Sequence, residues 1–573
     1  LSIRRQRQMC IRDSNDIIMK SKLIYLLLAG MLCTTSCQDI LEENPDSYYQ
    51  RKDFFVNASN AELAVMGIYN VLPTIYGDKD GMSLPCSDDT YYVNGTTSDP
   101  RRDIAHYVLK PSNIWVYNVW KGKYEGVNRA NYAIDGIEGM KGFRNDDNLK
   151  KLVGEARFLR AQATFDLVRY WGDVPFKTVY SDGYEMSYLP RTDREDIYEQ
   201  IIEDLEYAKS NLPWATSASS PERATQGSAR ALLMRVLLTR AGYSLRPDGT
   251  LQRPADALRR KYFEAVVTEW EAFQKNGYHK FYTNGYVELF KGFSAGILSA
   301  EESLFEVAFL VNKNKGIWGT CNGPLVATPV IKPTEAGKFM GRANAMFRVV
   351  PEWKDFFEEN DVRRDVMVCT HSYSWDAEAY NHKQVEQSNR KKWYPGKWRR
   401  EWMPIGYADP NNTSVNYCML RYADVVLMAA EAYNELGETP TAWKLLNSIR
   451  NRAGATEINS DNYSKLLKSP KVYDLDFIDD SDEIGRFRTA LYWERGFELA
   501  FEGQRKYDLI RWGILKEALV LFGEKTHSQV NNDKTTGYPA GKNFQKGKHE
   551  LLPIPEDELQ INYKLNNQNN PGY

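Results

Sequence analysis

A serine flanked by glycines is the first residue whose setting suggests chemistry. Residues 292–296 read GFSAG and match the G-x-S-x-G pattern, in which Ser294 would be a nucleophile. That pattern works at a strand-to-helix turn of a parallel sheet, where the hydroxyl stands exposed. The surrounding sequence lacks alternating strands and helices, and no histidine lies in a recognisable triad context. We interpret the match as coincidental and keep Ser294 only as a catalytic alternative.

Three glutamates follow one another at a spacing of four residues in the segment WERGFELAFEG. On a helix Glu494, Glu498 and Glu502 would share one face, with about 5–6 Å between neighbours. Retaining glycosidases hold two carboxyl groups about 5–5.5 Å apart, so a surface glycoside hydrolase is geometrically possible. Like charges at this spacing repel, and four arginines lie close in sequence: Arg488, Arg495, Arg505 and Arg511. We therefore favour a structural network of ion pairs between stacked helices.

No pattern in the sequence points to a metal or a cofactor. One acidic run could hold Ca²⁺ but lacks the EF-hand order of ligands and glycine; its residues are Asp474, Asp476, Asp479, Asp480, Asp482 and Glu483. Zinc has no support, because the six histidines form neither an H-E-x-x-H motif nor a Cys/His cluster. Neither a Walker A loop nor a G-x-G-x-x-G motif occurs. We predict a solvated acidic loop, no metal and no cofactor.

The start of the chain has the pattern of an export signal. An apolar run, residues 23–32, follows Lys20 and Lys22 and is too short to cross a bilayer as a helix. Small polar residues then precede Cys37, where cleavage would leave a cysteine that can be diacylated and anchored stably. We predict a lipoprotein signal at 19–36 and lipidation of Cys37, with Cys33 as the competing anchor. Residues 1–18 fit no signal pattern and are interpreted as a non-native upstream extension.

Charge and composition narrow the classes of partner. Removing the six basic and two acidic residues of 1–36 leaves 68 basic and 74 acidic residues, a net charge of −6. Such a balance gives no support for nucleic acid as a partner. Aromatic residues make up 13% of the chain, and Tyr and Trp offer the flat apolar faces and polar edges that suit wet ligand surfaces.

Four cysteines lie beyond the leader, and no two of them form a C-x-x-C pair: Cys86, Cys321, Cys369 and Cys418. In an exported protein they could form two disulfides in three connectivities. Free buried thiols are an equally good interpretation, because a core of this size needs no covalent support. The sequence leaves both possibilities open.

Helical periodicity dominates the rest of the chain and occurs in pairs. Apolar residues at helical spacing predict four helix hairpins that resemble tetratricopeptide repeats, two within about 151–276 and two within about 420–518. Between them, about 277–417 is rich in Gly, Pro, Asn, Trp and Tyr and is only weakly periodic. We expect a mostly α fold with a large loop-rich insertion that carries short strands and supplies the binding loops.

Four segments together resemble one known family. They are GEARFLRAQATFDLVRYWGDVPF, LRYADVVLMAAEAYNELGE, ERGFELAFEGQRKYDLIRWG and the C-terminal LLPIPEDELQINYKLNNQNNPGY. In this order they are similar to the SusD/RagB family of outer-membrane lipoproteins of Bacteroidetes, over residues 37–573. Two departures, Tyr563 in place of a proline and one additional Asn in QNNPGY, lie in a terminal packing segment.

The resemblance implies a function without catalysis. Such a protein would be anchored on the cell surface through Cys37 and would cover a SusC-like TonB-dependent transporter as a lid. Its ligand would be an oligosaccharide, or a peptide as in the RagB branch. The family motifs are scaffold motifs, so they do not identify the ligand.

Candidate ligand-binding residues come from stretches that combine aromatic rings with hydrogen-bonding groups, the composition of a sugar site. The first stretch, CSDDTYYVNG, lies where the family often contacts its ligand and contributes Asp88, Asp89, Tyr91, Tyr92 and Asn94. The second contains Trp318, which stands near glycines and should be hard to bury. The third, KKWYPGKWRREW, contributes Trp393 and Trp402 beside basic residues that could bind an acidic glycan; we expect its Trp398 to be structural.

Overall fold

A computed structural model describes residues 51–77, 85–93, 99–310, 314, 316–330, 339–403, 411–466, 475–522 and 539–573. The predicted upstream extension, the signal and Cys37 lie outside the described residues, as does Asn94. The short helix α2 (Arg51–Phe54) falls outside the main unit, which residues 57–573 form.

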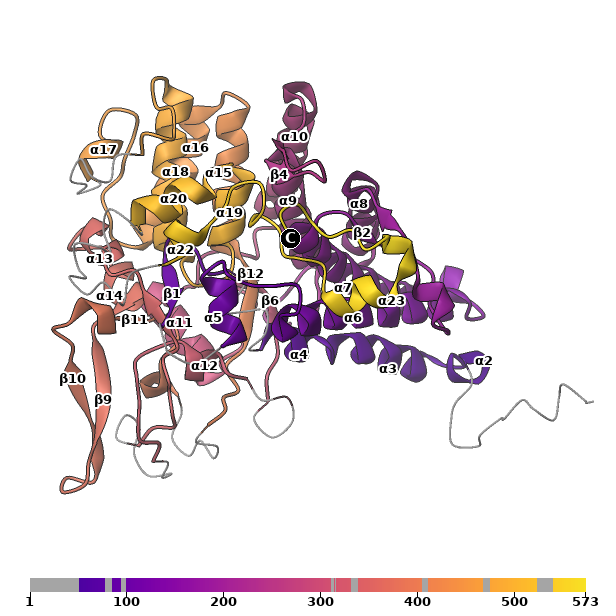
Figure 1. Cartoon of the computed structure of the whole chain (residues 1–573), viewed down its shortest axis with the longest axis horizontal. Coiled ribbons are helices and arrows are strands. Elements are labelled where there is room, and N and C mark those ends of the chain that lie inside the picture. The colour runs from indigo at the N-terminus through magenta and orange to yellow at the C-terminus, as the bar shows by residue number, and fades with distance from the viewer. Residues whose placement is uncertain are drawn as a thin grey trace, which may run out of the picture. The chain divides into compact units, whose positions relative to one another are not determined.

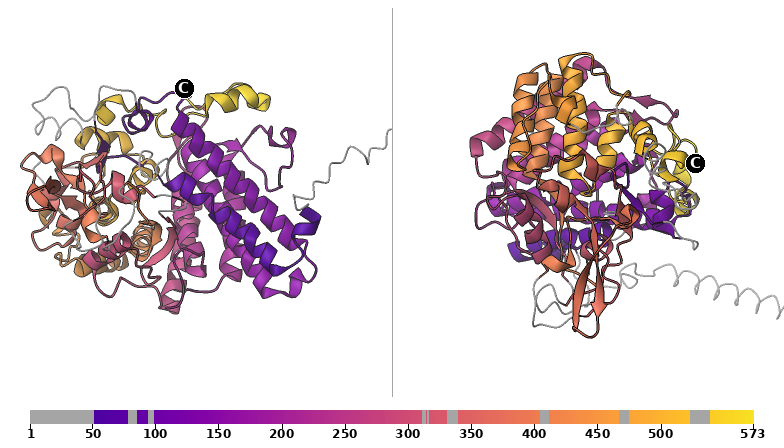
Figure 2. Two further views of the ribbon diagram at one scale, coloured as in Figure 1. Left: turned by 90° about the horizontal axis from the view of Figure 1, so that it is seen from below. Right: turned by 90° about the vertical axis from the view of Figure 1, so that its left-hand side faces the viewer.

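Two long helices form the N-terminal part of this unit. Helix α6 (Ile114–Glu138) begins where the Asn113 side chain accepts hydrogen bonds from the backbone N–H groups of Trp115 and Val116. It packs along α7 (Asp147–Trp171), which is buried over most of its length. Shorter helices accompany them (Figure 2): α3 (Ala58–Tyr69), α4 (Leu72–Tyr76) and α5 (Pro100–Ala105). The four predicted hairpins did not include α6.

The predicted helix hairpins are present, and the mostly α fold is confirmed (Figure 1). The first pairs α7 with α8 (Arg194–Asn211), the second α9 (Gln226–Ala241) with α10 (Asp256–Asn276), and the third α15 (Tyr422–Glu435) with α16 (Thr439–Arg452). In the fourth, α18 (Glu483–Leu499) precedes two short helices, α19 (Arg505–Arg511) and α20 (Leu515–Val520). Gly513 separates these two with φ 76°, and a Cβ there would lie 2.9 Å from the Tyr243 ring.

Residues 277–417 contain short helices and strands between the second and third hairpins. The helices are α11 (Tyr286–Ala295), α12 (Trp318–Cys321), α13 (Trp353–Phe356) and α14 (Arg363–Met367). Antiparallel pairs join β1 (Thr90–Tyr92) to β7 (Phe347–Val349), β6 (Ser303–Val307) to β12 (Tyr417–Arg421), and β8 (Val368–Cys369) to β11 (Tyr394–Pro395). Strands β9 (His371–Asp376) and β10 (Asn381–Glu386) form a ribbon, drawn at the lower left of Figure 1. Minor pairs are β2 (Val174–Pro175) with β3 (Arg191–Thr192) and β4 (Ser244–Leu245) with β5 (Leu251–Gln252).

The C-terminal segment packs back onto the first helices. The Asn570 side chain donates hydrogen bonds to the backbone oxygens of Trp171 and Leu552, at 3.0 and 2.7 Å. The Trp171 indole donates in turn to Pro553 O at 2.8 Å. The C-terminal segment, one of the four that carry the family resemblance, therefore has a packing role. The remaining short helices are α17 (Tyr463–Leu466), α22 (Pro539–Asn543) and α23 (Glu556–Ile561).

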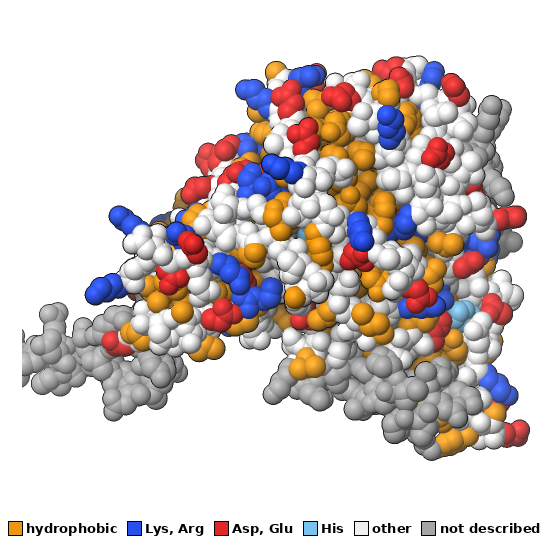
Figure 3. Space-filling view, turned by 180° about the vertical axis from the view of Figure 1, so that it is seen from behind, with side chains coloured by type: hydrophobic (Ala, Val, Ile, Leu, Met, Phe, Trp, Pro, Cys, Tyr) orange, Lys and Arg blue, Asp and Glu red, His pale blue; other side chains and the backbone are white. Residues whose placement is uncertain are grey.

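The surface carries charges of both signs. On the face opposite to that of Figure 1, basic and acidic side chains are intermixed and hydrophobic side chains lie between them (Figure 3). Among the described residues, no helix combines the length and apolar character needed to cross a membrane. The four described cysteines are buried and form no disulfide among the described residues, which favours the interpretation as thiols.

Candidate functional site

Asp88 and Asp89, two of the predicted ligand contacts, lie inside the protein. The Arg505 guanidinium donates two hydrogen bonds to Asp88, at 2.9 and 2.7 Å, and the Tyr492 hydroxyl donates a third at 2.8 Å. Asp89 accepts a hydrogen bond from the backbone N–H of Phe501 at 3.1 Å, and burial, with the nearby Asp88 charge, raises the pKa of Asp89 to about 6. Asp88 thus attaches the N-terminal loop to α18 and α19, Asp89 attaches it to the segment between these helices, and neither carboxylate reaches the surface.

The aromatic candidates of the first two stretches are also buried. Tyr92 is fully buried and donates to Asp99, while Tyr91 is 8% exposed. Trp318 is fully buried and stacks on Tyr417 with ring centroids 4.6 Å apart. The expectation that Trp318 is hard to bury is wrong. The nearby Gly316 serves another close approach, because a Cβ there would lie 2.9 Å from the Phe309 ring.

Trp393 and Trp402 remain partly exposed. The Trp393 indole donates to Gln387 O at 2.9 Å, and the Arg390 guanidinium lies 5.0 Å from its ring centroid. Arg399 lies 4.5 Å from the ring centroid of Trp402. The basic residues of this stretch mostly have structural partners: Arg399 pairs with Glu401, Arg400 donates to Arg342 O, and Lys397 is buried against Glu502. Trp398 is 1% exposed, as expected for a structural residue, and the local geometry does not favour an acidic ligand.

A third group of aromatic residues, which sequence reasoning missed, lies at the free end of the β9–β10 ribbon. Trp375 and Tyr380 are 5.2 Å apart between ring centroids, and the Phe339 ring lies 6.1 and 5.9 Å from them. Phe339 and Trp375 are half-buried, and Tyr380 is 50% exposed. We call Phe339, Trp375 and Tyr380 the ribbon cluster. The alternating sequence HSYSWD signals the strand, but it does not show that Phe339 joins it from another segment.

Polar contacts fix the ribbon both near its free end, where His382 lies opposite Trp375, and at its base, where His371 lies opposite Glu386. The His382 ring accepts a hydrogen bond from the Met340 N–H at 3.1 Å. His371 lies 3.2 Å from Glu401; although burial alone would lower the pKa of His371, its contacts with Cys369 and Glu401 raise it to about 9. His371 is therefore a cation at neutral pH, paired with Glu401. The ribbon cluster is held in place by these contacts rather than by its own two strands.

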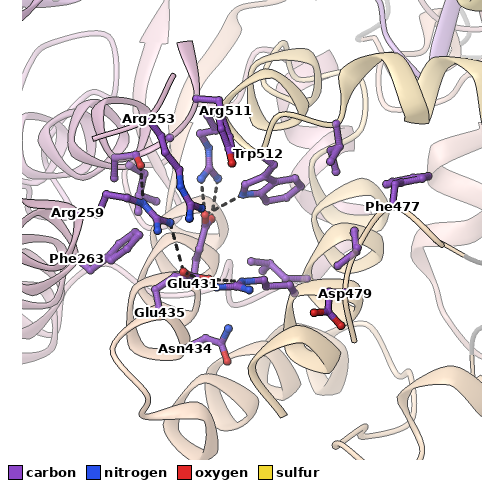
Figure 4. Close-up of a pocket in the computed structure, with 18 residues that line it drawn as sticks. Arg253, Arg259, Phe263, Glu431, Asn434, Glu435, Phe477, Asp479, Arg511 and Trp512 are labelled. Carbon is purple, nitrogen blue, oxygen red and sulfur yellow. Dashed lines mark hydrogen bonds and ion pairs between the residues drawn. The ribbon is translucent and has the colours of Figure 1, made fainter. Parts of the chain in front are cut away.

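Separately, a pocket of about 230 Å³ lies where the second, third and fourth hairpins meet (Figure 4). Glu431, from α15, accepts hydrogen bonds from Arg511 at 2.7 Å and from the Trp512 indole at 2.9 Å. Glu435, one helical turn later, accepts hydrogen bonds from Arg488 at 2.6 and 2.9 Å. Half-buried aromatic rings complete the walls: Tyr243, Phe477 and Trp512.

Ser294 does not lie at a strand-to-helix turn. It occupies the last turn of α11, is 1% exposed, and its hydroxyl accepts from the Arg399 N–H at 3.4 Å. Gly296 ends the helix in the left-handed conformation, with φ 73°. The GFSAG match thus reflects a helix C-terminus, where glycine is common, and not a strand-to-helix elbow.

The three glutamates form the predicted ion-pair network with different partners. Glu494 pairs with Arg363 and Arg450, and Glu498 pairs with Arg363, Arg421 and Arg452. Glu502 lies beyond the end of α18 and pairs with Arg421 and Lys397. The four arginines that are close in sequence pair with other acids: Glu435, Asp424, Asp508, Asp88 and Glu431. All three glutamates are at most 5% exposed, so the geometry that suggested a glycosidase is absent from the surface.

The described part of the acidic run has structural roles. Asp482 caps α18 by accepting from the Gly485 N–H at 2.7 Å, and Asp480 accepts from the Tyr463 hydroxyl at 2.5 Å. Among the described residues, no three His, Cys, Asp or Glu side chains are grouped as metal ligands. Asp474 lies outside the described residues.

Comparison with known proteins agrees with this scaffold. Residues 346–573 match the model of the SusD family, and residues 39–238 match a model described as starch-binding associating with outer membrane. SusD-like protein P2 of Formosa agariphila is 29% identical over 97% of this chain and all of its own length.

Solved structures show the same fold. A SusD homolog from Bacteroides thetaiotaomicron superposes with a TM-score of 0.76 at 25% identity, covering 91% of this chain and 98% of its own. A laminarin-binding SusD-like protein superposes with a TM-score of 0.63 at 24% identity, covering 90% and 100%. Two family models in chain order, relatives over the full length and a shared fold agree: this chain belongs to the SusD/RagB family.

Proposed function

We propose that the protein is a cell-surface glycan-binding protein that captures an oligosaccharide without cleaving it and delivers it to a TonB-dependent outer-membrane transporter. The observation that carries the proposal is the ribbon cluster, because partly exposed rings offer flat apolar faces to the C–H faces of a sugar. The similarity to a laminarin-binding protein of the same fold supports this class of ligand.

The surroundings of the ribbon cluster favour a sugar over a peptide. Asp376 and Lys383 form an ion pair on the ribbon, and Gln384 donates to Glu386 at 2.7 Å. Carboxylate, ammonium and amide groups beside an aromatic platform can exchange hydrogen bonds with sugar hydroxyls. Trp393, near the base of the ribbon, and Trp402 are proposed as further contacts.

The proposed place of action is the outer surface of the outer membrane, with Cys37 as the lipid attachment site. The family model described as associating with the outer membrane supports this placement, and it matches from residue 39 onward. The SusC-like transporter is proposed as the partner from the family resemblance.

Calorimetric titration of a soluble protein that begins at Gln38 tests the proposal. The titrants are laminarin, starch, mannan and mucin oligosaccharides, with short peptides for comparison. We expect heat from one glycan class and a loss of affinity of about fivefold to tenfold in Trp375→Ala, since stacking on one ring contributes about 1–1.5 kcal/mol. Tyr184→Ala is the matched control, because Tyr184 is 87% exposed and lies on another loop.

One outcome would overturn the proposed ligand class, and another would overturn the proposed site. Heat from peptides with silence toward every glycan would assign a peptide-binding function. Glycan binding that Trp375→Ala and Tyr380→Ala leave unchanged would keep the ligand class but remove the ribbon cluster as its site.

A further inference from the structure

The pocket between the hairpins lies where three helices end. Helix α9 ends at Ala241, α15 at Glu435 and α19 at Arg511, and all three residues line the pocket. Helix C-termini present carbonyl oxygens without intrahelical partners, which are hydrogen-bond acceptors. Here Ala241 O accepts from the Arg259 guanidinium at 3.0 Å, and Arg511 O accepts from the Tyr243 N–H at 2.7 Å. The pocket is therefore rich in polar groups held at fixed positions.

The charges around the pocket are already matched. Glu431 is paired with Arg511, and Glu435 is paired with Arg488 and lies 3.5 Å from Arg259. A charged ligand would have to break one of these pairs, and separating a partly buried pair is costly. A neutral ligand can instead use the spare lone pairs, since each carboxylate has about four acceptor sites.

Two groups at the rim complete the set of donors and acceptors. Figure 4 shows Arg253 extending toward the centre of the pocket and Asp479 on the opposite side. The Arg253 side chain is 39% exposed, its guanidinium lies over the Tyr243 ring at 5.3 Å, and its ion pair with Asp256 is long, at 3.7 Å. Arg253 can therefore donate hydrogen bonds to an incoming ligand without leaving a buried partner.

We propose that this pocket is a second carbohydrate site that holds one neutral sugar unit, such as the end of a glycan chain. The volume of about 230 Å³ lies below the 300–1,000 Å³ of sites for larger ligands, so the pocket accepts a single ring and not a chain. Phe477 and the other half-buried rings supply the apolar wall, and Arg253 with Glu431, Glu435 and Asp479 supplies partners for hydroxyls. The ligand class rests on the proposed function, whereas the site is separate from the ribbon cluster.

Saturation-transfer NMR on the soluble protein tests this proposal with the methyl glycosides of glucose, galactose and mannose as probes. We expect saturation of at least one glycoside by the wild type and by Trp375→Ala. The signal falls about fivefold or more in Arg253→Ala and in Phe477→Ala, as expected for loss of one good contact of about 1 kcal/mol. Arg260→Ala is the matched control, since Arg260 is exposed and pairs with Glu264 on the outside of α10.

The outcomes separate the two sites. Oligosaccharide binding that Trp375→Ala removes, without saturation of any methyl glycoside, refutes the pocket and leaves the proposed function standing. A glycoside signal that is lost in Trp375→Ala but kept in Arg253→Ala and Phe477→Ala assigns all binding to the ribbon cluster and also refutes the pocket. A methyl glycoside signal that depends on Arg253 and Phe477, without oligosaccharide binding at the ribbon cluster, supports the pocket as a sugar site. The same result rules out the ribbon cluster as one.

Discussion

Trp318 and Trp375 carry the same side chain in opposite environments. Trp318 is fully buried against Tyr417 and donates to Tyr76 O at 3.2 Å, whereas Trp375 lies at the free end of a two-stranded ribbon. A ring that is enclosed on both faces contributes to stability, and a ring with an open face can contribute to binding. Truncation of Trp318 should therefore change stability, whereas truncation of Trp375 should change binding.

Trp318→Ala should lower the free energy of unfolding by about 3–5 kcal/mol, the usual cost of removing a large buried ring. Urea unfolding followed by circular dichroism measures the change. Trp375→Ala is the comparison and should stay within about 1 kcal/mol of wild type, because the residue lies on the surface side of the ribbon. A Trp318→Ala protein of wild-type stability would contradict the structural role.

Glu352 gives stability a dependence on pH. It is 2% exposed, both carboxylate oxygens lack hydrogen-bond partners among the described residues, and burial raises its pKa to about 7. An acid whose pKa is raised on folding binds its proton more tightly in the native state, so stability falls as pH rises from about 4.5 through 7.

The rise of the pKa from the ordinary 4.5 corresponds to roughly 3–4 kcal/mol at about 1.36 kcal/mol per pH unit. Glu352→Gln should therefore match the wild type near pH 4.5 and exceed it in stability above pH 7. Thermal unfolding at both pH values checks this expectation. Equal wild-type and variant stability at pH 8 would show that Glu352 ionises without cost.

At the scale of elements, one buried network joins α18 to two other hairpin helices and to the inserted segment. Glu498 pairs with Arg363 of α14, with Arg421 before α15 and with Arg452 at the end of α16. Burial would raise the pKa of Glu498, but the surrounding guanidinium groups hold it well below its usual range. The network thereby fixes the orientation of the insertion that carries the ribbon.

Glu498→Gln should destabilise the protein by about 3–5 kcal/mol at neutral pH, because it leaves buried arginines without a counter-charge. The charge of Glu498 stabilises the fold above pH 4.5, and this contribution disappears as the pH falls toward the lowered pKa. The difference in the free energy of unfolding between wild type and Glu498→Gln should therefore be smaller at pH 3 than at pH 7. Urea unfolding at the two pH values measures it. Glu264→Gln, in an exposed pair, should change stability by less than about 0.5 kcal/mol.

At the scale of the whole molecule, the scaffold and the candidate binding surfaces are separate. The four hairpins and the C-terminal motif hold the fold, while the ribbon cluster lies in the insertion and the pocket lies between hairpins. Family membership therefore follows from one part of the molecule, and ligand choice would follow from another. Loops and ribbons can change without loss of the scaffold, which allows one fold to serve different ligands.

Membrane attachment is a prediction for the intact chain. Cys37→Ala should move the protein from the membrane fraction to the soluble fraction, because two acyl chains are needed for stable anchoring. Cell fractionation with immunoblotting measures the distribution, and Cys33→Ala is the matched control. Release by Cys33→Ala alone would identify Cys33 as the anchor.

The sequence by itself determined the elements whose signals are local. Apolar residues at helical spacing are read within one segment, so the four hairpins could be predicted, although the fourth is interrupted at Gly513. The family motifs were equally accessible, since each is read within one short segment; Asn570 and Trp171, from two of these segments, contact each other in the structure.

Only the tertiary structure decided which partners meet and which rings stay exposed. Arg363 reaches Glu498 across more than a hundred residues, while the arginines near Glu498 in sequence pair elsewhere. Trp318 is enclosed because Tyr417 comes from a distant strand, and the ribbon cluster exists because Phe339 reaches Trp375. Burial and ion pairing depend on distances in space between segments far apart in sequence, and local spacing does not encode those distances.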